Sequence, residues 1–205
     1  MSVIIIGGGV SGLVLGYNLQ KANIPFKILE SQNRLGGRIM TILGKKNTPM
    51  ELGATWFADY HHHLIDLLHE LQIGYFPQHT EGVSLFQTRS YEPPQKFYIP
   101  PSDGVSYRIK GGTSSLINAL EAKINPESIL LNTTVSFIED NNSEIIVTDK
   151  KGQIYNAKKV IISIPPQLVS QINFIPELSK ELINLLPNIH TWMSGSIKFA
   201  IEFEN

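Results

Sequence analysis

The sequence predicts an α/β fold, and three observations support that prediction. An entirely apolar, β-branched run at residues 3–6 is followed by a glycine-rich turn, a helical stretch and a second strand at 26–29, which together form a βαβ unit. Residues 75–107 differ in composition, because they hold seven of the 16 Tyr and Phe residues and five of the 12 prolines. Strand-like runs resume from residue 129 onward. We therefore expect a sheet whose chain is interrupted by an insertion.

Length and composition exclude several classes of protein. The 205 residues, of which 42% are hydrophobic and 17% charged, fit one large domain or two intertwined small ones. The net charge is −1 and no stripe of Lys or Arg is present, so no nucleic-acid partner is expected. The absence of cysteine excludes disulfides and thiolate metal sites within the chain. The sequence has no apolar run of about 18 residues and no signal-peptide pattern, so we expect a cytoplasmic protein without a membrane span.

The remaining elements follow from hydrophobic periodicity. Apolar residues at helical spacing predict helices around 64–71 and 116–124. Apolar runs predict four more strands, at 129–131, 135–138, 145–147 and 160–162. Asn141-Asn142 and Lys151-Gly152 are expected to form hairpin turns.

The C-terminal part of the chain also has a periodic pattern. Residues 178–186 suggest a helix, and apolar residues alternate with others over 196–203, which predicts a last strand. Because no closing element follows that strand, we expect the chain to be a fragment.

The glycine-rich turn after the first strand predicts a dinucleotide site. Gly7, Gly9 and Gly12 match the G-x-G-x-x-G pattern: the first glycine turns tightly, the second lets a pyrophosphate approach, and the third lets the helix pack on the strand. Val10 and Ser11 open the helix, whose N-terminal N–H groups favour an anion. Glu30 ends the next strand and can accept both ribose hydroxyls, whereas it would repel the 2′-phosphate of NADP. NAD and FAD remain open at this point.

The next segment favours FAD. Residues 30–38 resemble the extended E-x-x-x-R-x-G-G-R signature of the flavin-containing amine oxidase (monoamine oxidase-like) family, in its N-terminal portion. Gly36 and Gly37 let backbone pass close to the pyrophosphate, and the forked guanidinium of Arg38 can reach its oxygens. Arg34 either does the same or pairs with a surface acid.

Four later regions also resemble the family, and they extend the resemblance over nearly the whole chain. They are residues 51–56, 110–112, 131–135, and 160–166 with 172–176. The resemblance implies that 53–56 lies along the flavin and that Val135 holds the adenine through its backbone amide and carbonyl. The expected cofactor-binding residues are Gly7, Gly9, Val10, Ser11, Gly12, Glu30, Ser31, Gly36, Gly37, Arg38, Gly53, Ala54, Thr55, Trp56 and Val135.

Two departures from the family pattern are visible. Gln32 stands where many members have an additional arginine, which weakens one phosphate or adenine contact. The resemblance also implies the rest of a substrate domain, a lysine beside flavin N5 and a C-terminal FAD segment, and we expect all three to be absent from these 205 residues. We interpret Lys198 as a strand-face lysine rather than as that active-site lysine, so no catalytic side chain is predicted.

Three side-chain groups have a structural interpretation beside a functional one. His61, His62 and His63 are successive helical residues that point about 100° apart, so we expect a solvated helix start and no metal site. Trp56 either stacks near the flavin or fills the core. The aromatic residues of 75–107 either pack together or line a substrate pocket.

The resemblance implies an FAD-binding Rossmann-like domain with an inserted α+β substrate domain and without its C-terminal part. We assign residues 1–75 and 105–175 to the FAD-binding domain, 76–104 to the inserted segment and 176–205 to the start of a second substrate segment.

The function implied is that of an FAD-dependent oxidoreductase that oxidises an amine by hydride transfer to flavin N5, with oxygen reoxidising the flavin. The alternatives are an FAD-dependent desaturase, a protoporphyrinogen-oxidase-like enzyme, and a catalytically incomplete dinucleotide-binding fragment. A small-molecule amine is the expected partner, and a complementing C-terminal chain and a homo-oligomer are further partner hypotheses.

Overall fold

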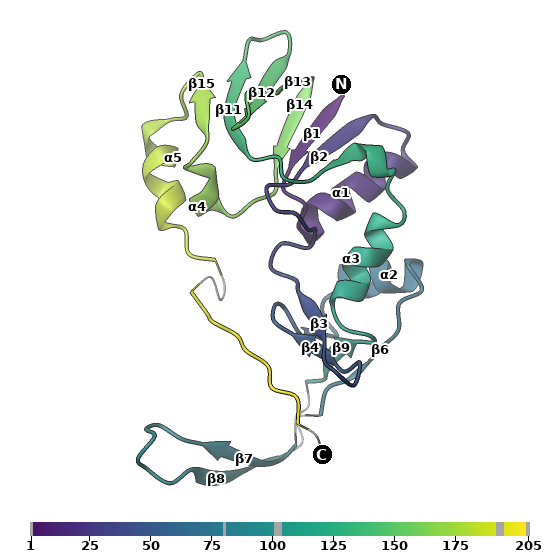
Figure 1. Ribbon diagram of the computed structural model, residues 1–205, viewed down its shortest axis with the longest axis vertical. Helices are drawn as coiled ribbons and strands as arrows, with labels where there is room; N and C mark the ends of the chain where they lie inside the picture. The colour runs from purple at the N-terminus through teal and green to yellow at the C-terminus, as the bar shows by residue number, and fades with distance from the viewer. Residues whose placement is uncertain (1, 80, 101–103, 192–194, 204–205) are drawn as a thin grey trace.

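The centre of the fold is a four-stranded parallel sheet (Figure 1). The computed structural model describes residues 2–79, 81–100, 104–191 and 195–203. The sheet has the order β10-β2-β1-β14. Its strands are β10 (Ile129–Leu130), β2 (Phe26–Leu29), β1 (Val3–Ile6) and β14 (Lys159–Ile162). The predicted βαβ unit is therefore confirmed, and chain segments from both ends of the sequence flank β1.

Strand β1 is buried on both faces, as its uninterrupted apolar run predicts. Val3 and Ile5 belong to a core cluster with the helices, whereas Ile4 and Ile6 belong to a second cluster on the opposite face. Each side-chain set thus anchors a different layer, because successive residues of a strand point to opposite faces.

Helices cover the first face of the parallel sheet. They are α1 (Val10–Lys21), α2 (His62–Glu70) and α3 (Ser114–Glu121), and the last two occupy the predicted helical regions. Tyr17 Oη on α1 donates a hydrogen bond to Glu70 Oε1 on α2 (2.7 Å), and Lys21 Nζ donates to the same oxygen (2.5 Å). The bond from Lys21, followed by that from Tyr17, lowers the pKa of Glu70.

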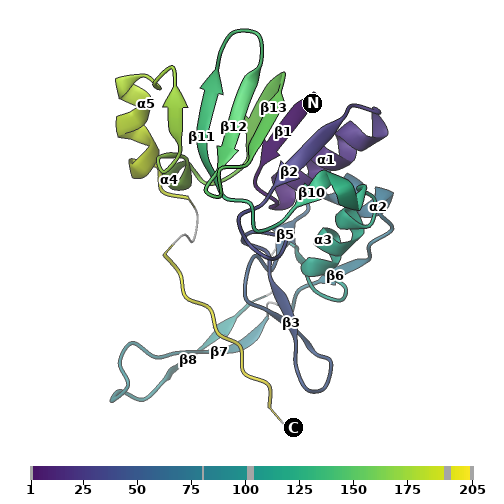
Figure 2. The same ribbon diagram turned by 45° about the horizontal axis from the view of Figure 1, so that its top comes forward.

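A second sheet covers the other face (Figure 2). Its order is β13-β12-β11-β15, with antiparallel pairs apart from the parallel pair β11–β15. The strands are β11 (Val135–Asp140), β12 (Ile145–Asp149), β13 (Ile154–Ala157) and β15 (Asn173–Ile175). Beyond them lie α4 (Pro166–Val169), α5 (Lys180–Leu185) and the 3₁₀ turn η2 (Leu186–Asn188). A 3₁₀ turn, η1 (Pro126–Ser128), precedes β10.

Three small sheets lie at the end of the molecule away from β11–β13 (Figure 1). The first pairs β3 (Thr41–Leu43) with β4 (Pro49–Glu51). The second has the order β5-β9-β6 and consists of β5 (Phe57–Ala58), β9 (Ser106–Ile109) and β6 (Tyr75–Pro77). The third is a hairpin of β7 (Gly82–Phe86) and β8 (Gln95–Ile99), which projects from the body.

One predicted element is wrong. Residues 195–203, all of which the structure describes, form no strand, although their side chains alternate as expected. Alternation reports that a segment is extended, whereas a strand also needs a hydrogen-bonded neighbour. The predicted helix at 178–186 is confirmed by α5 and η2. No helix among the described residues is long and apolar enough to cross a membrane.

The core makes a direct test of the helical layer possible. Leu120 on α3 is fully buried in the helix-side cluster, so Leu120→Ala should lower the free energy of unfolding by about 2–5 kcal/mol. The same change at Leu43, which is 63% exposed, should cost less than about 0.5 kcal/mol. Urea unfolding followed by circular dichroism measures both. Equal losses would contradict the placement of α3 against the sheet.

Candidate functional site

The turn between β1 and α1 depends on glycines, because a side chain at two of its positions would collide with neighbouring atoms. A Cβ on Gly12 would lie 2.0 Å from the carbonyl oxygen of Gly7, and one on Gly7, whose φ is +110°, would lie 2.7 Å from Ile164 Cγ2. Helix α1 can therefore approach β1 closely only with glycine at these positions. The single proton of the Ser163 hydroxyl is shared between the carbonyl oxygens of Ile6 (3.0 Å) and Gly7 (3.1 Å), and this bifurcated bond holds the turn from the β14 side.

The N-terminus of α1 opens onto free space. Gly9 is the N-cap, it makes no side-chain cap bond, and no acidic residue lies in the first turn. A Cβ added to Gly9 would meet no atom within 4 Å among the described residues. The first-turn N–H groups, which include those of Val10, Ser11 and Gly12, have no acceptor within an α-helix. This end of the helix can therefore receive an anion.

Glu30 is buried and held in place beside the turn. Its Oε2 accepts the N–H of Gly8 (2.6 Å), and its Oε1 accepts the N–H of Gln32 (2.8 Å) and the hydroxyl of Ser31 (3.3 Å). A carboxylate has about four acceptor positions, so one remains, and a second becomes free when the Ser31 hydroxyl turns away. Glu30 can therefore accept both ribose hydroxyls only when the Ser31 hydroxyl has rotated away from it.

The Gly36-Gly37 turn meets the first glycine turn backbone to backbone. The N–H of Gly36 donates to the carbonyl of Gly8 (2.8 Å), and Gly9 and Gly36 form an isolated parallel bridge. A Cβ on Gly37 would lie 3.3 Å from the Cα of Gly9. Gly36 and Gly37 both have positive φ, at +100° and +56° respectively. The two turns thus present a surface of main chain without side chains.

The two arginines of the signature have different environments. Arg34 donates from Nη1 to the carbonyls of Leu35 (3.0 Å) and Ile39 (3.1 Å) and from Nη2 to that of Gly37 (2.7 Å). It therefore braces the turn, and none of the ion pairs found among the described residues involves it, so the hypothesis of a surface ion pair is not supported there. A phosphate contact of Arg34 stays a prediction. Arg38 is exposed, and no ion pair or hydrogen bond occupies its guanidinium within the part of the chain that the structure describes.

The segment at 53–56 packs against the chain around Arg38. The N–H of Ala54 donates to the carbonyl of Arg38 (3.1 Å), and a Cβ on Gly53 would lie 2.1 Å from that same oxygen. Thr55 Oγ1 donates to the carbonyl of Gly53 (3.1 Å). Trp56 is 56% exposed, so the hypothesis that it fills the core is wrong.

Glu51 organises the neighbouring helix start. Its Oε1 accepts the N–H (2.5 Å) and the hydroxyl (3.0 Å) of Thr113, and its Oε2 accepts the hydroxyl of Thr41 (2.9 Å). The carboxylate thereby caps α3, where negative charge is favourable. Sequence reasoning placed Glu51 only within a family segment and missed this role.

Val135 lies on the other side of Glu30. Two backbone bonds connect its segment to the end of β2: the N–H of Thr133 donates to the carbonyl of Glu30, and that of Asn132 to the carbonyl of Gln32, both at 2.9 Å. Val135 is the first residue of β11 and its side chain is buried. Its contact with adenine stays a prediction.

The histidines do not converge. His61 Nδ1 accepts the N–H of Ala58 (2.9 Å) and precedes α2, while His62 and His63 are exposed at the helix start. His69 Nε2 lies 3.5 Å from Tyr75 Oη. No group of three or more potential metal-ligating side chains occurs within residues 2–79, 81–100, 104–191 and 195–203.

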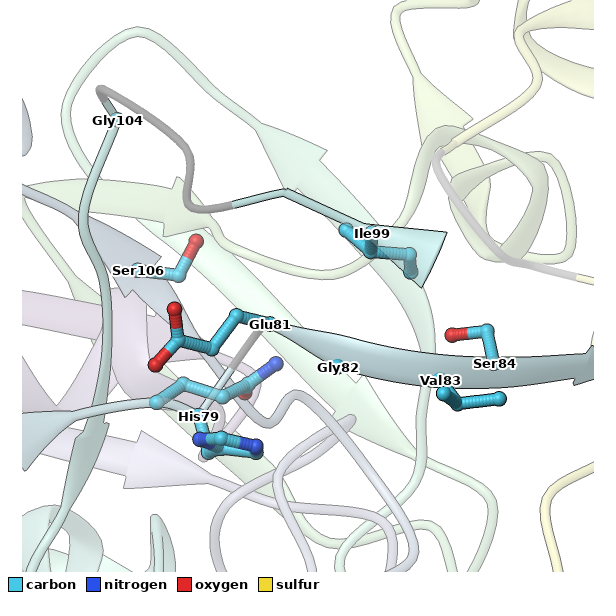
Figure 3. Close-up of a pocket in the computed structure, with 9 residues that line it drawn as sticks. His79, Glu81, Gly82, Val83, Ser84, Ile99, Gly104 and Ser106 are labelled. Atoms are coloured by element: carbon cyan, nitrogen blue, oxygen red, sulfur yellow. The ribbon is translucent and has the colours of Figure 1, made fainter. Parts of the chain in front are cut away.

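An open cavity of about 760 Å³ lies at the base of the β7–β8 hairpin (Figure 3). The described residues that line it include no Phe, Tyr or Trp: they are Gln78, His79, Glu81, Gly82, Val83, Ser84, Ile99, Gly104 and Ser106. Tyr75 and Tyr107 instead pack on Phe57, with ring centroids 5.4 and 5.6 Å away. For these two the packing interpretation is confirmed, whereas Tyr91 and Tyr98 on the hairpin are exposed.

Comparison with known proteins decides between the two dinucleotides. The family described as flavin containing amine oxidoreductase matches residues 10–100 and 92–205. The chain belongs to this family. The resemblance read from the sequence is therefore confirmed, as is the α/β fold, and the family implies FAD as the cofactor.

Individual relatives agree with the family assignment. A probable flavin-containing monoamine oxidase A of Dictyostelium discoideum is 31% identical over 130 residues, which are 61% of this chain and 27% of that protein. Cyclohexylamine oxidase from Brevibacterium oxydans IH-35A has a similar fold, with a TM-score of 0.79 at 16% identity over 90% of this chain. Wild-type putrescine oxidase bound to putrescine gives 0.75 at 18% identity. This chain covers 62% of the length of each of these two solved structures and 27% of the length of the Dictyostelium protein.

The residues of the site fit the nucleotide half of FAD. Open space at Gly9, an uncapped helix N-terminus, a fixed carboxylate at Glu30 and a free guanidinium at Arg38 lie around one glycine surface. Together they supply what a ribose and a pyrophosphate need. The individual contacts remain predictions.

Substitutions at Gly9 and Gly12 should separate binding from folding. Gly9→Ala should change the free energy of unfolding by less than about 1 kcal/mol, because a poorer N-cap and a less flexible unfolded chain offset each other. It should nevertheless weaken FAD binding, since the new methyl fills the open space. Gly12→Ala should destabilise the fold by about 1–3 kcal/mol through overlap with Gly7. Chemical unfolding and FAD titration measure the two effects, and a Gly9→Ala chain with unchanged FAD affinity would contradict the site.

Arg38→Ala should weaken FAD binding by about tenfold to a hundredfold, because a charge-assisted bond to phosphate contributes about 1.5–3 kcal/mol. Glu30→Ala should weaken binding as well, and should also destabilise the chain because the N–H groups of Gly8 and Gln32 lose their acceptor. Arg89→Ala removes an exposed arginine of the hairpin loop that pairs with Glu92, and serves as the control. Fluorescence titration with FAD gives all three constants; equal constants for Arg38→Ala and Arg89→Ala would refute the phosphate contact.

Proposed function

We propose that this chain forms the FAD-binding portion of an FAD-dependent amine oxidase. The observation that supports the proposal most directly is the glycine surface between two turns, with the Glu30 carboxylate at one side and the Arg38 guanidinium free at the other. Membership of the flavin containing amine oxidoreductase family adds the reaction class.

The proposed reaction converts an amine to an imine. Bound FAD would supply a two-electron acceptor at N5 for the hydride from the α-carbon, the amine nitrogen would lose a proton, and oxygen would later take up the two electrons with two protons as hydrogen peroxide. The imine then hydrolyses to a carbonyl compound. Gly9 and the α1 N-terminus bind the pyrophosphate, Glu30 orients the ribose, and the 53–56 segment borders the flavin. Two proteins with a similar solved structure are a putrescine oxidase and a cyclohexylamine oxidase, which favours an amine as the substrate.

The first test is the cofactor content of the purified chain. We expect absorbance bands near ~370 and ~450 nm and about one FAD released per chain on denaturation. A chain that remains colourless with added FAD, while folded by circular dichroism, would show that these residues do not suffice to hold the cofactor.

The second test is the substrate class, and it uses the whole protein that contains this chain. Under anaerobic conditions a primary amine such as putrescine or cyclohexylamine should bleach the ~450 nm band, whereas the matching alcohol should not. Bleaching by protoporphyrinogen or a polyene, and not by amines, would favour the alternative FAD-dependent enzymes instead.

A further inference from the structure

The segment 195–203 has two different faces. It runs extended from the α5 side of the molecule toward β3 and β4 (Figures 1 and 2). Its odd-numbered apolar side chains, Ile197, Phe199, Ile201 and Phe203, are between 67% and 91% exposed. Two of the even-numbered side chains, Lys198 and Glu202, bind the body of the protein. An extended chain places alternate residues on opposite sides, so one face of the segment is attached and the other is not.

The contacts of Lys198 involve two of the residues that are expected at the flavin. Its Nζ donates to the carbonyl oxygen of Gly53 and to Thr55 Oγ1, both at 2.6 Å. Because Thr55 Oγ1 also donates to the Gly53 carbonyl at 3.1 Å, the three groups form a closed triangle. An ammonium has three donors and no acceptor, which matches two oxygens of this kind.

The contacts of Glu202 lie elsewhere. Its carboxylate accepts the N–H of Lys45 (2.7 Å) and of Lys46 (3.3 Å), in the turn between β3 and β4. The segment is therefore attached at two separate points, of which only the one at Lys198 involves residues expected at the flavin.

The Gly53–Thr55 backbone in turn contacts Arg38. The N–H of Ala54 donates to the Arg38 carbonyl at 3.1 Å, and Gly53 packs on the same oxygen without room for a Cβ. Any shift of the 53–55 backbone would therefore move the main chain that carries the free guanidinium.

We propose that Lys198 is a positioning residue of the cofactor site: its ammonium fixes the Gly53–Thr55 backbone and, through it, the main chain of Arg38. The proposal rests on the proposed cofactor site and names a residue that acts on it from 145 positions away in the sequence. Lys198 acts through the loop and does not itself perform the chemistry.

The test compares Lys198→Met with Glu202→Met in the full chain. Lys198→Met keeps the apolar stem and removes the ammonium, so amide exchange at Ala54 should become faster in the absence of FAD, and FAD affinity should fall about fivefold, the scale of an exposed contact made by a charged side chain. Glu202→Met removes both oxygens that accept the N–H groups of Lys45 and Lys46, and should leave both quantities unchanged. If loss of attachment alone mattered, both variants would behave alike, which would overturn the proposal.

Two further variants identify the interaction itself. Lys198→Arg retains the cation and should restore most of the FAD affinity and the visible circular dichroism of bound flavin, which a generally destabilised chain would not regain. Thr55→Val removes one acceptor, and combining it with Lys198→Met should cost less than the sum of the single losses. Strictly additive losses would overturn the direct contact.

The outcomes separate this proposal from the proposed function. If the wild-type chain binds FAD but the whole protein oxidises no amine, the proposed amine oxidase function is refuted. The effect of Lys198→Met on FAD affinity can still be measured in that case. If the wild-type chain bound no FAD, these residues would not suffice to hold the cofactor, and unchanged Ala54 exchange in Lys198→Met would refute the positioning contact independently.

Discussion

The architecture depends on how closely three backbone segments approach one another where β1 ends. A Cβ on Gly12 would overlap the Gly7 carbonyl, and the two glycine turns meet backbone to backbone at the Gly9–Gly36 bridge, where a Cβ on Gly37 would lie 3.3 Å from the Cα of Gly9. Glu30, from the next strand, fastens the N–H of Gly8. The same absence of side chains therefore lets α1 pack on the sheet and exposes the main chain that a pyrophosphate would contact.

Local patterns were sufficient wherever both the cause and the result lie within a few residues. The run at 3–6 identified a strand buried on two faces, and the structure supplies the two layers that bury it, α1 on one side and β11–β13 on the other. Leucines at helical spacing likewise identified α2 and α3. The spacing of the glycines predicted the tight turn between β1 and α1 for the same reason, because a turn between a strand and a helix is a local structure.

Distant partners could not be predicted in this way. Glu51 caps a helix 62 residues later, and Lys198 binds a carbonyl 145 residues earlier. Neither residue has a local pattern that distinguishes it from an ordinary surface charge. Ser163 is the single polar residue in the apolar run 160–164, which indicates a specific role for its hydroxyl. The sequence could not show which groups it contacts, because its two acceptors are 156 and 157 positions away. The alternation at 196–203 identified two faces correctly but could not supply a neighbouring strand.

The charged groups of the site contribute to the free energy in two different ways. Arg34 uses its guanidinium on three backbone carbonyls, so its interaction energy already stabilises the folded chain before any ligand arrives. Arg38, four residues later, leaves its guanidinium in water and contributes little to the folded chain's stability. Its interaction energy can appear only when an anion binds, and so belongs to affinity rather than to folding. Because the turn beside Arg38 is already rigid, less conformational entropy is lost when an anion binds, and this preorganisation raises affinity. The ammonium of Lys198 extends the same logic, because it binds the Gly53 carbonyl and Thr55 Oγ1 without occupying any donor of Arg38.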